Sequence, residues 1–185
     1  MLKQVWDFLK NPMYVTDENK GFNYRFRVFI KLLLLSVSIN IVLGMLIGSL
    51  ETVFGLNLGE HALDRFFEKY PTVYFLLGAV ITAPVIEELI FRGPMILFKN
   101  NHFFGVVFYV LTLVFGFYHI TNFELNGRVL LLSPILVAPQ LVVGGLLGFI
   151  RIRFGLIWSI ALHACYNLVL AGPIILMKML NIPLE

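Results

Sequence analysis

Two adjacent carboxylates, Glu87 and Glu88, stand late in an otherwise apolar stretch, and Arg92 follows the second by four residues. In a helix Glu88 and Arg92 share a face and can pair, whereas Glu87 points about 100° away from its neighbour. An ionised side chain within a membrane helix is unfavourable by about 2.5–3.5 kcal/mol, so such residues usually face a cavity or a partner. An ordinary ion pair near a helix end would explain Glu88 and Arg92 but not Glu87. Glu87 is therefore the better candidate for a base that takes a proton from water.

Two further apolar stretches also carry polar residues that could take part in hydrolysis. His119 ends one of them, and His163 and Asn167 lie four residues apart on one helical face within the apolar run 158–170. Taken singly, each is more often the source of a hydrogen bond between helices than a catalytic group. Their coincidence with Glu87 indicates a shared site.

The stretches that carry these residues are predicted to be membrane helices. Of the 185 residues, 59% are hydrophobic and only 14% are charged, whereas a soluble domain averages about 25% charged residues. Stretches of about 20 continuously apolar residues cross a bilayer as helices, because lipid leaves no partner for free backbone groups. The sequence predicts an all-α, polytopic transmembrane helical bundle with five spans, near residues 29–50, 71–91, 103–122, 129–150 and 154–177.

The chain reads as one integral membrane domain over 1–185, with no internal repeat. We expect residues 1–28 to be cytoplasmic or interfacial. Their apolar residues beside lysines, up to Pro12, are typical of a helix lying on the membrane, and a disordered tail is the alternative. Residues 61–70 are expected to form a second interfacial amphipathic helix.

The lysines and arginines predict how the chain is oriented. With a cytoplasmic N-terminus, ten of the 14 fall on the inner side and four on the outer side. They form no basic stripe, so we expect no nucleic-acid partner. The expected location is a prokaryotic plasma membrane.

Three motifs, in order on successive segments, are similar to those of a known family: Glu87-Glu88-x-x-x-Arg92, Phe115-x-x-x-His119 and His163-x-x-x-Asn167. They resemble the motifs of the CAAX-protease and bacteriocin-processing family, intramembrane endopeptidases related to the type II CAAX prenyl proteases. The resemblance covers a motif-bearing core over residues 75–170.

The resemblance implies a helical core with a conical cavity, open to the membrane and the cytosol, in which water hydrolyses a peptide bond. It implies that Glu87 is the base and that His119 helps to hold or polarise the water. His163 and Asn167 would stabilise the oxyanion on the scissile carbonyl. The implied partners are a peptide or protein substrate in or at the membrane and the lipid bilayer itself.

Supporting roles within the motifs fall to Glu88, Arg92 and Phe115. No cofactor is required by the sequence, but catalytic zinc stays open, because zinc takes His and carboxylate ligands with one position left for water. The zinc ligands would then be Glu87, His119 and His163. Since no His-Glu-x-x-His sequence occurs, a glutamate-dependent mechanism is favoured.

Two other functions remain as alternatives. A non-proteolytic membrane scaffold or bacteriocin-immunity protein would share the fold, and a small transporter or channel would also place Glu and His within the membrane. The predicted spans also leave one conflict, because they put Glu87 near the inner end of the second span and His119 near the outer end of the third. A tilted third span, or a second helix continuing to about Lys99, would bring them to one depth.

Overall fold

The structure is a computed structural model that describes residues 1–55 and 71–180. Every element within these ranges is a helix and none is a strand, as the sequence predicts. The amphipathic helix expected over 61–70 lies outside the described residues. The helical elements are α1 (Leu2–Lys10), α2 (Phe22–Phe54), α4 (Thr72–Leu76), the π-helical η1 (Leu77–Thr82), α5 (Ala83–Phe91), the 3₁₀-helical η2 (Pro94–Phe98), α6 (Phe104–Tyr118), the 3₁₀-helical η3 (His119–Asn122), α7 (Gly127–Leu136), α8 (Ala138–Phe154) and α9 (Leu156–Met179).

Five helical segments of the described chain are long and apolar enough to cross a membrane, which confirms the predicted number. They are Phe22–Phe54, Thr72–Phe98, Phe104–Asn122, Gly127–Phe154 and Leu156–Met179. The boundaries differ from those expected in the first segment, which begins at Phe22 instead of residue 29, and in the second, which continues to Phe98 instead of ending at residue 91. It combines α4, η1, α5 and η2, so the two glutamates stand well inside it.

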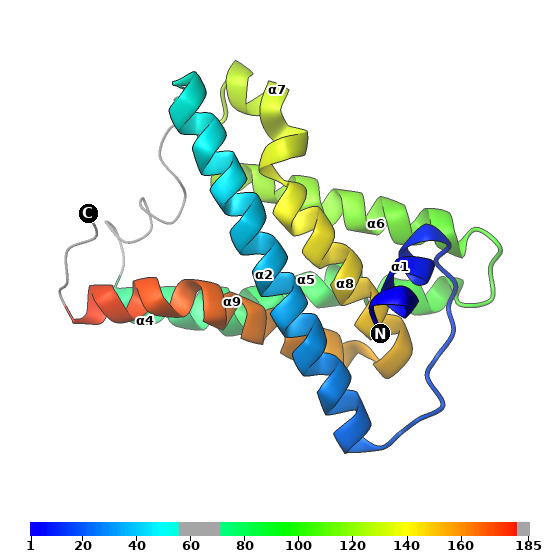
Figure 1. Ribbon diagram of the computed structural model, residues 1–185. Coiled ribbons are helices and arrows are strands. Elements are labelled where there is room, and N and C mark those ends of the chain that lie inside the picture. Colours follow the sequence, from blue (N-terminus) through cyan, green and yellow to red (C-terminus); the bar gives the residue numbers. More distant parts are fainter. Residues whose placement is uncertain (56–70, 181–185) are drawn as a thin grey trace.

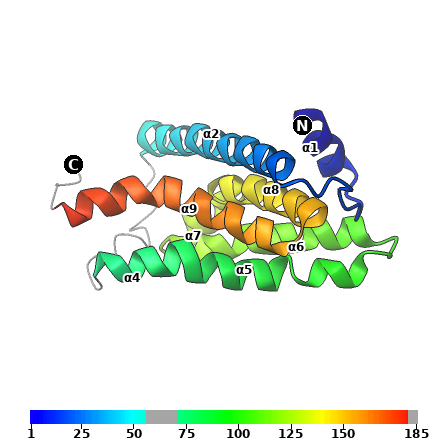
Figure 2. The same ribbon diagram turned by 90° about the horizontal axis from the view of Figure 1, so that it is seen from below.

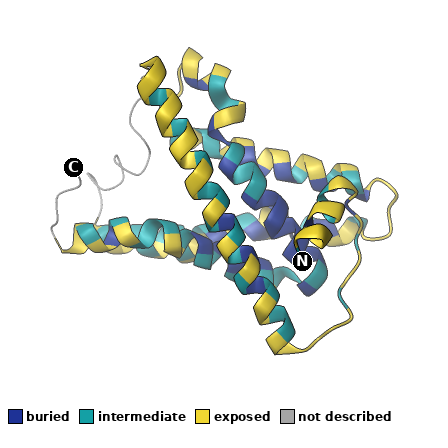
Figure 3. Cartoon of the chain, viewed as in Figure 1, coloured by how far each residue is buried: buried dark blue, intermediate teal, exposed yellow. Residues whose placement is uncertain are grey.

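The helices form three layers (Figures 1 and 2). In Figure 2, α1 and α2 lie on one side, α8 and α9 in the middle, and α5 and α6 on the other side. Helix α8 is the centre of the fold, because it packs against α2, α6 and α9. Its residues from Val143 onward are almost all buried, and Figure 3 shows this as a dark stretch behind α2.

Glycines let α6 approach α8 closely. A methyl group added at Gly148 would stand 2.5 Å from Cε2 of Phe108, whose side chain is itself buried. A methyl group at Gly144 would stand 3.0 Å from Cδ1 of Phe115 and 3.2 Å from Nη2 of Arg92. The α6–α8 contact therefore depends on small residues, as is common between membrane helices.

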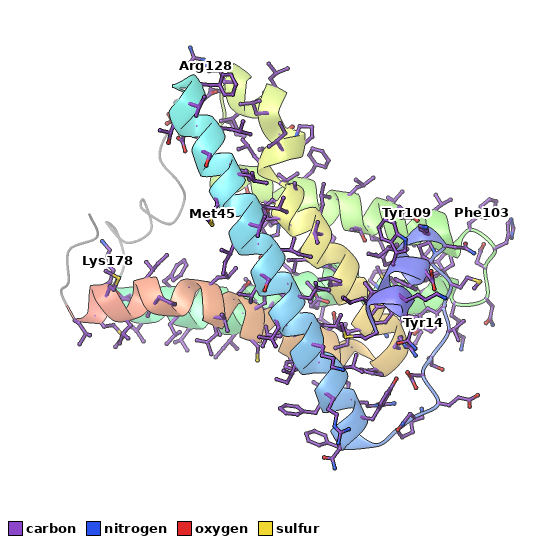
Figure 4. The ribbon with its side chains drawn as sticks, in the orientation of Figure 1. Tyr14, Met45, Phe103, Tyr109, Arg128 and Lys178 are labelled. Carbon is purple, nitrogen blue, oxygen red and sulfur yellow. The ribbon has the colours of Figure 1, made fainter. Side chains whose placement is uncertain are left out.

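The outward faces of the helices are apolar. On α2, Met45 and Val53 are 68% and 76% exposed, and Figure 3 shows exposed residues along the whole outer side of this helix. Such a surface suits lipid and not water. Figure 4 shows Met45 on this face, with Arg128 and Lys178 at helix ends away from Tyr14 and the N-terminal segment.

Helix α1 packs on the bundle through the apolar residues of one side. Val5 is buried, and the ring of Phe8 meets the rings of Phe108 and Phe149 edge-on, at centroid distances of 5.0 and 5.4 Å. Trp6 points outward and is 60% exposed. The segment before Pro12 is thus helical, and its position on the membrane surface stays a prediction.

Candidate active site

Glu87 on α5, His119 at the start of η3 and His163 on α9 converge on one point. The Nε2 atoms of both histidines lie 3.8 Å from Oε2 of Glu87. The three groups therefore stand at the same depth, although the predicted spans had separated Glu87 from His119. The reason is the longer second segment. Because this segment continues to Phe98 before the chain turns into α6, Glu87 lies in its interior, where it faces His119.

The other ring nitrogen of each histidine is already engaged. Nδ1 of His119 lies 2.8 Å from the carbonyl oxygen of Phe115, and Nδ1 of His163 lies 3.1 Å from Oε1 of Glu88. A carbonyl oxygen only accepts, so Nδ1 of His119 carries a proton. These bonds fix both rings and direct Nε2 toward Glu87. Oε2 of Glu87 is buried and has no hydrogen-bond partner among the described residues.

Glu88 is the centre of a buried network that shares His163 with the site around Glu87. Its Oε1 lies 3.2 Å from Nη1 of Arg92, and both side chains are completely excluded from solvent, so the ion pair expected from their spacing is present. The hydroxyl of Ser159 donates to Oε2 of the same carboxylate. With His163, three groups therefore surround Glu88, and the pattern of residues had indicated only Arg92.

Arg92 joins three helices. Its Nη2 donates to the carbonyl oxygen of Gly144 at 3.2 Å, and its guanidinium carbon lies 3.8 Å from the ring centroid of Phe115. Its backbone carbonyl accepts a hydrogen bond from Nε of Arg151 at 3.1 Å. The ten cations that the sequence assigns to the inner side include Arg92 and Arg151, but both are buried, so the predicted orientation rests on the remaining eight.

Asn167 satisfies a backbone group that the π-helical segment leaves free. The N–H of Ala83 is used by the carbonyl of Gly78, and Pro84 has no N–H to offer. The carbonyl of Ala79 therefore lacks a partner within its own helix, and Nδ2 of Asn167 donates to it at 2.8 Å. Short π-helical turns of this kind are frequent at functional sites.

A cavity of about 480 Å³ contains all four residues predicted to be catalytic: Glu87, His119, His163 and Asn167. Its wall includes further polar side chains that the motifs did not indicate, among them Asn40 on α2, Gln140 on α8 and Tyr166 on α9. Their signal in the sequence is a lone polar residue within an apolar span. The rest of the wall is largely apolar.

The donor types at this point suit zinc, but their spacing is wide. Tetrahedral zinc with bonds of about 2.0–2.1 Å places its ligands about 3.3 Å apart. The two histidine nitrogens each stand 3.8 Å from Oε2 of Glu87. Within the described residues no group of three or more His, Cys, Asp or Glu side chains is arranged to hold a metal ion.

A carboxylate that faces two imidazoles inside a membrane-embedded cavity is equipped for acid–base chemistry on water, as an intramembrane hydrolase requires. The family model described as type II CAAX prenyl endopeptidase Rce1-like matches residues 69–169, and the chain belongs to this family. The match includes all three motifs and confirms the family resemblance. It supports CAAX-type intramembrane endopeptidase activity in general. No curated protein and no solved structure matches the chain.

Proposed function

We propose that the protein is an intramembrane endopeptidase that hydrolyses a peptide bond of a lipid-modified or membrane-associated peptide or protein. The observation that carries this proposal is the convergence of His119 and His163 on Oε2 of Glu87. This oxygen is buried and has no hydrogen-bond partner among the residues described. A buried carboxylate oxygen of this kind is a natural site for a water molecule.

Glu87 activates that water together with His119. Two partners 3.8 Å apart can both lie about 2.8 Å from one water oxygen. The water donates one hydrogen to Oε2 of Glu87 and the other to Nε2 of His119, which is an acceptor in the neutral ring. Its lone pair then attacks the scissile carbonyl while Glu87 takes a proton. When the C–N bond breaks, the protonated Glu87 returns that proton to the leaving amine.

His163 and Asn167 stabilise the oxyanion. For this role His163 acts as an imidazolium, which donates Nδ1–H to Glu88 and has Nε2–H left for the oxyanion. Asn167 donates one amide hydrogen to Ala79 and retains the second. Preorganised donors of this type lower the barrier by about 2.7–4 kcal/mol each in other hydrolases.

The substrate and its surroundings follow from the same site. The apolar outer faces of the helices support a substrate that reaches the cavity from the bilayer or its surface. The location in a prokaryotic plasma membrane and the cytoplasmic N-terminus are part of this proposal. Supporting roles fall to Glu88, Arg92 and Phe115, because their mutual contacts hold α5 against α6 and α9.

The direct test is cleavage by the purified protein in nanodiscs, on a panel of fluorogenic prenylated and leader-type peptides. Wild type is compared with Glu87→Ala and His163→Ala, and Glu18→Ala is the control, because Glu18 is exposed in the N-terminal segment. We expect cleavage by wild type and the control, and its loss in the other two variants. A zinc chelator should leave the rate unchanged, and loss of cleavage on chelation would favour the zinc mechanism.

The alternative is a scaffold or immunity protein of the same fold. It would be supported if no peptide is cleaved and Glu87→Ala retains full function in cells. A transport function would instead appear as ion or proton flux through proteoliposomes that depends on Glu87.

A further inference from the structure

Four carboxamide side chains line the cavity, and two of them, Asn122 and Asn167, lie on η3 and α9, the elements that carry the histidines. The other two, Asn40 and Gln140, have no part in activating water. Asn40 comes from the middle of α2 and Gln140 from the first turn of α8, two helices that pack against each other. Neither residue belongs to a motif that the sequence singled out. They stand in the wall that also contains Glu87 and His163.

The carboxamide of Asn40 is held in one orientation. The hydroxyl of Tyr166 donates to its Oδ1 at 2.8 Å. This bond uses the oxygen of the carboxamide as an acceptor and leaves the two hydrogens of Nδ2 as its donors. Tyr166 follows His163 by three residues on α9, so the two side chains share a face of this helix, and both line the same cavity as Asn40.

Gln140 presents the opposite group. Its Oε1 is buried and accepts no hydrogen bond from any residue in the described part of the chain. A buried carbonyl oxygen without a donor is destabilising, so its presence in a cavity indicates that something else supplies the donor. The cavity wall contains other polar side chains, among them Tyr118 and Asn122, but none of them donates to this oxygen.

A free amide donor and a free carbonyl acceptor in one cavity are complementary to a peptide unit, which offers one C=O and one N–H. A peptide that leaves water for an apolar cavity must have both groups satisfied. We propose that Asn40 and Gln140 bind the backbone of the substrate peptide. Nδ2 of Asn40 donates to a peptide carbonyl, and Oε1 of Gln140 accepts from a peptide N–H near the scissile bond. The inference rests on the proposed function and adds recognition of an extended backbone, independent of side-chain identity.

The test uses a backbone change matched to a side-chain change. A fluorescent prenylated peptide and a series of its ester isosteres, each with one N–H replaced by oxygen, are bound to the full chain in nanodiscs. Binding is measured by fluorescence anisotropy in a Glu87→Gln background, so it needs no cleavage. We expect Gln140→Leu to weaken binding of the peptide about 3–10-fold, as the loss of one hydrogen bond does. In the protein that retains Gln140, one ester should bind more weakly than the parent peptide. In Gln140→Leu, this ester and the parent peptide should bind with equal affinity.

Stability separates this role from a structural one. Gln140→Leu removes a buried acceptor without a partner, so its melting temperature should equal or exceed that of the parent. Gln4→Leu, at an exposed position of α1, is the matched control and should change neither binding nor melting. Asn40→Leu is compared within a Tyr166→Phe background, so that no hydroxyl loses its partner, and it should also weaken peptide binding.

Two results would overturn the inference. One is equal binding of the peptide and all its esters to the Gln140 protein. The other is a weaker peptide affinity of Gln140→Leu that accompanies a lower melting temperature. Failure of the proposed function would give a different result, because wild type would then bind the peptide without cleaving it.

Discussion

The imidazole of His163 is held by Glu88, whose Oε1 lies 3.1 Å from Nδ1 of the ring. The opposite ring nitrogen faces Glu87. Two neighbouring glutamates of one helix thus serve one histidine from two sides, because consecutive helical residues point in different directions. Glu88 is fully buried among its partners, whereas Glu87 has 15% of its side chain exposed in the cavity. We expect the first to be needed for folding and the second for chemistry.

Glu88→Ala should lower the free energy of unfolding by about 3–5 kcal/mol, since it leaves the buried guanidinium of Arg92 without its carboxylate. Glu87→Ala should change it by no more than about 1 kcal/mol, because no partner of Glu87 depends on it for burial. Denaturant unfolding in detergent measures both. Equal losses in the two variants would contradict this division of roles.

Asn167→Ala should lower kcat about 10²–10³-fold with little change in KM, because the variant lacks an oxyanion donor. It should also lower the melting temperature, since the carbonyl of Ala79 loses its partner. Steady-state kinetics and a thermal melt of the same preparation separate the two effects. A lower melting temperature with unchanged kcat would leave Asn167 as a backbone partner alone.

Gly148→Ala should lower the free energy of unfolding by about 1–3 kcal/mol, because the added methyl group meets the buried ring of Phe108 at 2.5 Å. Gly48→Ala is the control. Nothing lies within 4 Å of a methyl group there, and alanine favours the helix. Unfolding in detergent should therefore give opposite signs for the two variants, and a loss of similar size in both would count against close packing of α6 on α8.

Asp17→Asn should loosen the N-terminal segment in a pH-dependent way. Partial burial raises the pKa of Asp17. The N–H of Asn19, the hydroxyl of Tyr24 and the guanidinium of Arg153 outweigh this, and they hold that pKa below its ordinary value of 3.8. The stabilisation is thus present above pH 3.8 and is lost as the pH falls through the lower folded pKa. The melting temperatures of wild type and variant should differ at pH 7 and converge in acid, and a gap that persists in acid would exclude ionisation of Asp17 as its cause.

The sequence was sufficient for the fold class and for the four motif residues that meet in the cavity, Glu87, His119, His163 and Asn167. Composition and the length of the apolar stretches predict five membrane helices, because lipid imposes both on any spanning segment. The distance between Glu87 and His119 could not be obtained this way. It depends on where the second segment ends, and the hydropathy of residues 92–98 does not mark that end.

The contacts around the site could not be predicted from the sequence either. Ser159 stands four residues before His163 and is visible as a spacing, but its bond to Glu88 requires the packing of α9 on α5. The bond from Asn167 to Ala79 requires a π-helical turn, which depends on Pro84 and on which carbonyl the N–H of Ala83 selects. Such choices are settled by tertiary packing and not by local propensity.

The role of Glu87 as the base is tested most directly by the single-turnover cleavage rate of Glu87→Gln, measured in nanodiscs on the peptide that wild type cleaves fastest. Glutamine preserves the shape of Glu87 but cannot take a proton, so the rate should fall at least about 10²-fold. Peptide affinity and melting temperature should stay unchanged, and Glu18→Gln should cleave as wild type does. Cleavage by Glu87→Gln within a few-fold of the wild-type rate would contradict the account, because water would then be activated without this carboxylate.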